Sequence, residues 1–216
     1  MERCAAAVSD GEYTIESQAR AVLGLMGRLE IDKATIVGAS YGGAVAATMA
    51  LDYPQRVERL VLIGAVTNDE PKKKMLLRLS RLPVIGDIVT PLFLGSRWVL
   101  RRRTEQMYRR LGRPIDEHKL EARHHLLATA NVHRAMIRTA RRWSASRIQR
   151  DAKFISQPTM LIWGEDDTHI PIAEAFRLRD EIPNNRLVVF RNCGHLPPTE
   201  SPEQFVAAVS EFCQNR

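Results

Sequence analysis

The sequence predicts an α/β fold in which a mostly parallel sheet carries a helical insertion. The strongest sign is a short β-rich apolar run, residues 35–37, that ends in Gly38-Ala39-Ser40-Tyr41-Gly42-Gly43 and gives way to an alanine-rich helical pattern. Further buried strands are expected at residues 60–65, 158–163 and 186–190. Because the carboxyl ends of parallel strands lie along one edge of a sheet, where ligands bind, the residues that follow these strands should lie near one another.

The first expected element is a helix that begins after Thr14. Thr14 is a good N-cap, and the apolar residues that follow it repeat at helical spacing: Ile15, Ala19, Val22, Met26 and Leu29. This helix would precede the strand that leads to Ser40.

Ser40 has the sequence context of a nucleophile at a sharp strand-to-helix turn. Such a turn strains the backbone, exposes the hydroxyl and requires small neighbours, a need that Gly38 and Gly42 meet. The following helix, expected at residues 41–53, would direct the Tyr41 N–H and its positive dipole end at a developing oxyanion. A Gly-x-Ser-x-Gly motif also arises by chance, but the strand before it, the helix after it and Gly43 together favour a nucleophile.

A nucleophilic serine needs a base and an acid that orients the base, and both follow later in the chain. The strand at 158–163 runs into an acidic turn that contains Asp166 and Asp167, and the strand at 186–190 runs into Gly194-His195. The acidic turn could also be a solvated turn, and His195 an ordinary capping or core residue. Either alternative would leave Ser40 without its partners.

Three motifs in this order resemble the α/β-hydrolase superfamily, whose members place Ser, Asp and His in this sequence along the chain. They are Gly38-x-Ser40-x-Gly42-Gly43, then Trp163-Gly164-x-x-Asp167-x-x-x-Pro171, then Gly194-His195 followed by Glu200, Pro202 and Phe205. The resemblance implies catalytic Ser40, Asp167 and His195, with Asp166 as the alternative acid and Tyr41 in the oxyanion hole. It also implies that residues 1–67 and 151–216 form a partial hydrolase core and residues 68–150 a helical cap.

The same resemblance implies that strands are missing before Ser40. Family members carry several strands ahead of the nucleophile, one of which ends in a His-Gly loop that supplies a second oxyanion donor. Only about 33 residues precede the strand here, so we expect an N-terminally truncated product of impaired activity. The strand before Ser40 would then be an edge that recruits another strand, through a homodimer or by aggregation.

Charge is concentrated in the expected cap. Residues 68–150 hold 20 Lys and Arg against 7 Asp and Glu, in a chain of net charge +7. These arginines could form solvated faces paired with acids of the sheet domain, or could bind a substrate carboxylate through their bidentate geometry. A third interpretation, suggested by Lys72–Lys74 and Arg101–Arg103, is an anionic membrane surface or nucleic acid, but we find no nucleic-acid-binding motif.

Composition fits one domain with an insertion, at 216 residues and 44% hydrophobic. No apolar run reaches the length of a membrane span and no signal peptide is evident, so we expect a cytoplasmic protein. Cys4, Cys193 and Cys213 suit free thiols, and Cys193 is expected to be a packing residue. Most of the histidines other than His195 are expected to be surface or capping residues, and none has metal-ligand spacing: His118, His124, His125, His133 and His169.

The predicted function is serine hydrolysis of an ester or related carbonyl substrate through an acyl-enzyme, without metal or organic cofactor. Because Ser40 stands where dehalogenase and epoxide-hydrolase relatives place Asp, the resemblance points to carboxylesterases or to hydrolases that cleave carbon–carbon bonds in acidic ring-fission products. The alternative is a non-catalytic hydrolase scaffold, or a binding module whose basic cap is the working surface.

Overall fold

The computed structural model describes residues 13–69, 79, 82, 84–110, 112 and 114–214, so Cys4 and Lys72–Lys74 lie outside the described residues. The chain divides into two compact units. The sheet unit comprises Thr14–Asp69 and Ser144–Arg216, and the helical unit comprises Met1–Tyr13 and Glu70–Trp143.

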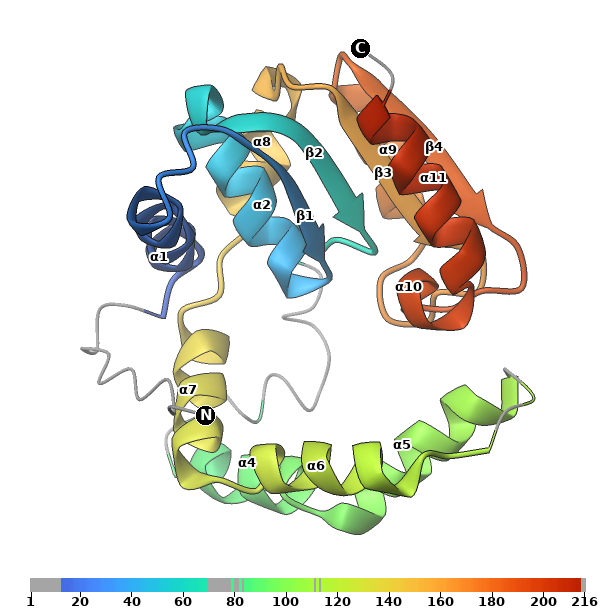
Figure 1. Ribbon diagram of the computed structural model, residues 1–216. Helices are drawn as coiled ribbons and strands as arrows, with labels where there is room; N and C mark the ends of the chain where they lie inside the picture. Colours follow the sequence, from blue (N-terminus) through green and yellow to red (C-terminus); the bar gives the residue numbers. More distant parts are fainter. Residues whose placement is uncertain are drawn as a thin grey trace. The chain divides into compact units, whose positions relative to one another are not determined.

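The sheet unit is built on four parallel strands in the order β1-β2-β3-β4 (Figure 1). The strands are β1 (Ala34–Ala39), β2 (Val57–Ile63), β3 (Thr159–Gly164) and β4 (Asn185–Phe190). All three neighbouring pairs run parallel, which confirms the predicted fold class. The carboxyl ends of the strands lie along one edge of the sheet. Near this edge Ser40 follows β1, Asp167 follows β3 and His195 follows β4.

Helices flank these strands. The first of them has the predicted N-cap residue, Thr14. Thr14 Oγ1 accepts a hydrogen bond from the Ser17 backbone N–H at 3.1 Å, so α1 begins at Ile15. The helices of the sheet unit are α1 (Ile15–Arg28), α2 (Tyr41–Asp52), α8 (Ser146–Asp151), α9 (Ala173–Glu181), α10 (Pro197–Glu200) and α11 (Pro202–Gln214), with short 3₁₀ turns at Pro54–Arg56 and Ala152–Phe154.

The core lies on both faces of the two central strands. Val61 and Ile63 of β2 pack with Met160 and Ile162 of β3, and the cluster is covered by apolar residues of α11, as Figure 1 shows for the helix and the β3–β4 part of the sheet. Because side chains alternate along a strand, Leu60 and Leu62 point to the other face, where they too are fully buried. A strand buried on both faces reads as a continuous apolar run, which makes β2 and β3 recognisable in the sequence.

β1 is an outer strand of the described sheet. Its pairing partner is β2, and Val37 near its end is half exposed. Association of two chains through this edge stays a prediction.

The helical unit contains α4 (Ile85–Leu94), α5 (Arg97–Arg110), α6 (Glu117–Leu127) and α7 (Ala130–Arg141). α4 packs against α7, and α5 against α6. The role of residues 68–150 as a cap stays a prediction.

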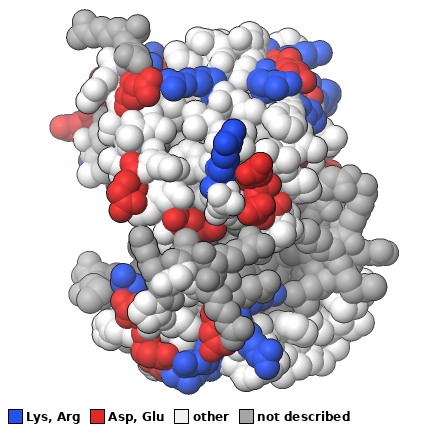
Figure 2. Space-filling model, turned by 90° about the vertical axis from the view of Figure 1, so that its right-hand side faces the viewer, with Lys and Arg blue, Asp and Glu red and all other residues white. Residues whose placement is uncertain are grey.

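Several arginines of the basic segment are paired with acids. Within the helical unit, Arg97 contacts Glu121 at 2.9 Å and Arg101 contacts Glu117 at 2.9 Å. Arg147, in the sheet unit, pairs with Asp52. Among the described residues coloured in Figure 2, basic and acidic side chains likewise lie close to one another. These pairs favour the interpretation of solvated, ion-paired faces, although most partners belong to the helical unit itself and not to the sheet domain.

Within the part of the chain that the structure describes, none of the helices is both long and apolar enough to cross a membrane.

Candidate active site

Ser40 occupies a strained turn between β1 and α2. Its backbone has φ 51° and ψ −119°, a conformation that residues other than glycine rarely adopt and that costs about 1–3 kcal/mol. The turn is fixed by backbone bonds to the end of β2 and to the segment after it: Ser40 N–H donates to the Ile63 carbonyl at 2.8 Å, and the Ser40 carbonyl accepts from Val66 N–H at 3.0 Å. The sharp, strained strand-to-helix turn predicted from the sequence is therefore present, and we call this turn the elbow.

The glycines around the elbow contribute differently from what the motif suggested. A Cβ at Gly38 would collide with the Gly42 carbonyl, and a Cβ at Gly43 would collide with Ala65, whereas a Cβ at Gly42 would meet no atom within 4 Å. Close packing therefore requires glycine at positions 38 and 43. Gly42 takes part through its backbone carbonyl, which lies against Gly38.

Asp167 lies in the loop after β3 and is a buried acceptor of three hydrogen bonds. Its Oδ1 accepts the backbone N–H groups of His169 and Ile170 at 2.8 and 2.9 Å, and its Oδ2 lies 2.7 Å from His195 Nδ1. Burial alone would raise the pKa of this carboxyl, but the hydrogen bonds from His195 and Ile170 outweigh it and lower the pKa below the usual aspartate value. Asp167 is therefore held as a carboxylate. Asp166, the alternative acid, is exposed.

His195 lies in the loop after β4, and Glu200 holds this loop in shape. The Glu200 carboxylate accepts the backbone N–H of Gly194 at 2.8 Å and that of Leu196 at 2.9 Å, one residue on each side of the histidine. Two charge-assisted bonds around one residue leave its backbone little freedom. The His195 side chain is 15% exposed.

The loop of Asp167 and the loop of His195 are joined directly. Asp166 N–H donates to the Cys193 carbonyl at 2.9 Å, and Glu165 N–H donates to the Phe190 carbonyl at 2.9 Å. Gly164, where β3 ends, packs so closely on the Cys193–Gly194 backbone that no Cβ would fit. Backbone hydrogen bonds and close packing thus hold the Asp167 loop and the His195 loop together.

Gly64 links this pair to the elbow. It follows β2 with φ +48°, and a Cβ there would lie 3.1 Å from His195 Nδ1 and 3.2 Å from Asp167 Oδ2. The preceding residue, Ile63, is the one whose carbonyl accepts the Ser40 N–H. The end of β2, at Ile63 and Gly64, therefore lies between the Ser40 backbone and the His195–Asp167 pair. Among the described residues, the two polar partners Ser40 Oγ and the His195 ring are not hydrogen-bonded to each other.

Tyr41 is the first residue of α2, and its side chain is turned toward α1. Gln18 Nε2 donates to the Tyr41 hydroxyl at 2.9 Å. Burial, aided by the negative charge of Glu16, raises the pKa of the Tyr41 phenol to about 12, so the phenol stays neutral. The predicted part of Tyr41 in binding an oxyanion concerns its backbone N–H alone and stays a prediction.

Cys193 precedes the histidine loop but is poorly suited to be a nucleophile. It is fully buried in the core cluster under α11. Burial, with a smaller contribution from Glu200, raises the pKa of its thiol to about 11.

In the described ranges of the chain, one group brings metal-ligand atoms together: Asp167, His169 and His195 offer atoms within 4.8 Å of one another. Both Asp167 oxygens already accept hydrogen bonds, and one of them holds His195 Nδ1. The group is thus already organised by hydrogen bonds as an acid–base pair.

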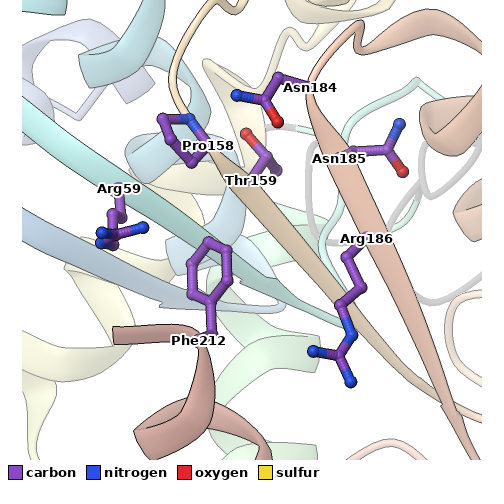
Figure 3. Close-up of a pocket in the computed structure, with 7 residues that line it drawn as sticks. All are labelled: Arg59, Pro158, Thr159, Asn184, Asn185, Arg186 and Phe212. Atoms are coloured by element: carbon purple, nitrogen blue, oxygen red, sulfur yellow. The ribbon is translucent and has the colours of Figure 1, made fainter. Parts of the chain in front are cut away.

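A shallow hollow of about 340 Å³ lies at the other end of the sheet, where β3 and β4 begin (Figure 3). Arg186 on its wall pairs with Glu211 at 2.7 Å, and Arg59 lies over the Phe212 ring at 5.6 Å. The hollow is lined by Arg59, Pro158, Thr159, Asn184, Asn185, Arg186 and Phe212. It is remote from the carboxyl ends of the strands, so we give it no part in the chemistry of the site.

Sequence reasoning missed two residues of this site. Gly64 belongs to no motif, and its closeness to His195 arises from strand order alone. His169 was expected to be a surface or capping residue. It is exposed, but its ring stacks on His195 with 4.9 Å between ring centroids and 22° between planes. The signal that could have found His169 is its place two residues after Asp167.

Comparison with known proteins agrees with this architecture. The chain is 31% identical over 204 residues to a 2-hydroxy-6-oxononadienedioate/2-hydroxy-6-oxononatrienedioate hydrolase of Burkholderia vietnamiensis, covering 90% of this chain and 67% of the relative. It is 28% identical over 218 residues to an uncharacterised protein of Mycobacterium tuberculosis, covering 93% of this chain and 62% of that protein. The chain thus spans less than two thirds of the length of some relatives that it matches.

A solved structure gives the same result. The crystal structure of MGS-M2, an alpha/beta hydrolase enzyme from a Medee basin deep-sea metagenome library, matches with a TM-score of 0.75 at 25% identity, covering 95% of this chain and 74% of that one. The family model described as the alpha/beta hydrolase fold matches residues 3–202. The chain therefore belongs to the alpha/beta hydrolase fold family.

Proposed function

We propose that this protein is a serine hydrolase in which Ser40 is the nucleophile, His195 the general base and Asp167 the residue that orients the base. The observation that carries the proposal is the 2.7 Å contact between His195 Nδ1 and a buried Asp167 carboxylate, one strand end away from a strained serine. A buried carboxylate on Nδ1 fixes the tautomer that leaves Nε2 free to accept a proton.

The reaction follows from these roles. As Ser40 Oγ attacks a carbonyl carbon, its proton passes to His195 Nε2, and the imidazolium that forms is stabilised by Asp167. The backbone N–H of Tyr41, at the positive end of the α2 dipole, binds the oxyanion. His195 then gives the proton to the leaving group, and an acyl-enzyme remains on Ser40. Water, deprotonated by the same histidine, releases the acid.

The substrate class we propose is an ester or a related carbonyl compound, with carbon–carbon bond hydrolysis as the specific variant. Two relatives support the variant: a 2-hydroxy-6-oxo-6-phenylhexa-2,4-dienoate hydrolase of Burkholderia cepacia and the Burkholderia vietnamiensis hydrolase described above. Their substrates are carboxylates, and the basic residues of the 68–150 segment would suit an acidic substrate.

Labelling with a fluorophosphonate probe tests the proposal. The Ser40 oxygen attacks the probe phosphorus and expels fluoride, leaving a stable phosphonate ester on an activated serine. We expect labelling of the wild type, loss of labelling in Ser40→Ala, and wild-type labelling in the control Ser144→Ala, which alters an exposed serine of the same unit. No labelling of the folded wild type at high probe concentration would instead favour a non-catalytic scaffold.

A further inference from the structure

His169 contacts the proposed site twice, once through its backbone and once through its ring. Its backbone N–H donates to Asp167 Oδ1 at 2.8 Å. Its imidazole lies nearly parallel to that of His195, with centroids 4.9 Å apart and planes inclined by 22°. This separation and tilt are those of an offset aromatic stack.

The stack supports His195 on the face of its ring. Asp167 holds the ring at Nδ1, and the end of β2 lies close by, since a Cβ added at Gly64 would be 3.1 Å from Nδ1 and 3.2 Å from Cε1. The Asp167 bond is a contact at the ring edge, about which the imidazole could still tilt. A flat ring on the face of His195 restricts this tilt.

The hydrogen bond beside the stack is itself shielded from solvent. His169 is exposed, whereas the side chains of His195 and Asp167 are 15% and 0% exposed. A hydrogen bond shielded from water is electrostatically stronger than a hydrated one.

We propose that His169 is a positioning residue whose ring packs on the face of the His195 imidazole and restricts its tilting about the Asp167 hydrogen bond. The inference rests on the proposed function, since it assigns the stack a part in keeping the general base aligned. The property that acts is the flat ring and not its titration, and the backbone bond to Asp167 is present whatever the side chain is.

Substitution at position 169 tests this with three variants. His169→Ala removes the ring but keeps the backbone donor, His169→Phe restores a flat ring, and Thr168→Ala alters an exposed neighbour as a control. With p-nitrophenyl acetate as the probe ester, we expect His169→Ala to lower kcat about tenfold with little change in KM, because alignment of a base affects the transition state more than binding. His169→Phe should recover most of kcat, and Thr168→Ala should retain all of it.

A second readout does not need catalysis. A proton shared between His195 Nδ1 and Asp167 gives a low-field NMR resonance, which we expect to broaden or disappear in His169→Ala and to return in His169→Phe. An unchanged resonance and unchanged kcat in His169→Ala would overturn the proposal, as would a His169→Phe variant as impaired as His169→Ala. If the wild type lacks esterase activity but shows the ring-dependent resonance, the proposed function fails while the positioning role stands.

Discussion

Gly64→Ala is the substitution that best separates the geometry of the site from the stability of the fold. Gly64 has φ +48°, and an added Cβ would lie 3.1 Å from His195 Nδ1 and 3.2 Å from Asp167 Oδ2. Two costs follow. The left-handed backbone costs an alanine about 1–2 kcal/mol, and the crowded ring must move by a few tenths of an ångström. A displacement of about 1 Å can lower kcat on the order of 10²-fold, so this smaller shift of the general base should lower kcat measurably but by less.

Gly112→Ala is the matched control. Gly112 also has positive φ, at +60°, but a Cβ at this position would meet no atom within 4 Å. Both variants should therefore lose about 1–2 kcal/mol of unfolding free energy in urea, whereas only Gly64→Ala should show slower hydrolysis of p-nitrophenyl acetate and slower fluorophosphonate labelling. If Gly64→Ala is destabilised but hydrolyses the ester as fast as Gly112→Ala, the argument that Gly64 leaves room for the acid–base pair is wrong.

Three further outcomes are expected. Glu200→Gln should cost about 1–2 kcal/mol in urea unfolding and reduce kcat, because a single amide oxygen replaces two charged acceptors of backbone N–H groups; unchanged stability would contradict the role given to that carboxylate. The lowered pKa of Asp167 contributes stability that is complete above the ordinary aspartate value of about 3.9 and is lost as pH falls through the folded value. Hence the free energy of unfolding in urea should be higher for the wild type than for Asp167→Asn, and this difference should be largest near neutral pH. A difference that grows as the pH is lowered would contradict the lowered pKa of Asp167. In a Cys4→Ser background at pH 7.5, iodoacetamide should modify the exposed Cys213 long before the buried Cys193, whose thiol pKa is raised to about 11; equal rates, measured by mass spectrometry, would show that Cys193 is accessible.

Local sequence patterns predicted those features that local physics determines. Apolar runs buried on both faces identified β2 and β3, and the Thr14 cap placed the start of α1 correctly. The strained Ser40 turn was predictable because the residues that permit it are its own neighbours. Asp167 and His195 were predictable as residues that follow strands, and the sheet order then brought them together.

What the sequence did not reveal depends on contacts between distant segments. Gly64 matters because β2 lies between β1 and β3, a fact of strand order that no motif contains. The stacking of His169 on His195 depends on the rotamer of His195, which lies 26 positions further along the sequence. A Cβ would fit at Gly42 but not at Gly43, because Gly43 packs on Ala65, which approaches the elbow only after the strands pair.

The bonds from the backbone of Glu165 and Asp166 to Phe190 and Cys193 have a consequence for how the site can change. Since they unite the two partners of the proposed proton-transfer pair on one rigid support, neither partner can move without the other. Substitutions in other segments of the chain can therefore accumulate while the geometry of this pair stays intact.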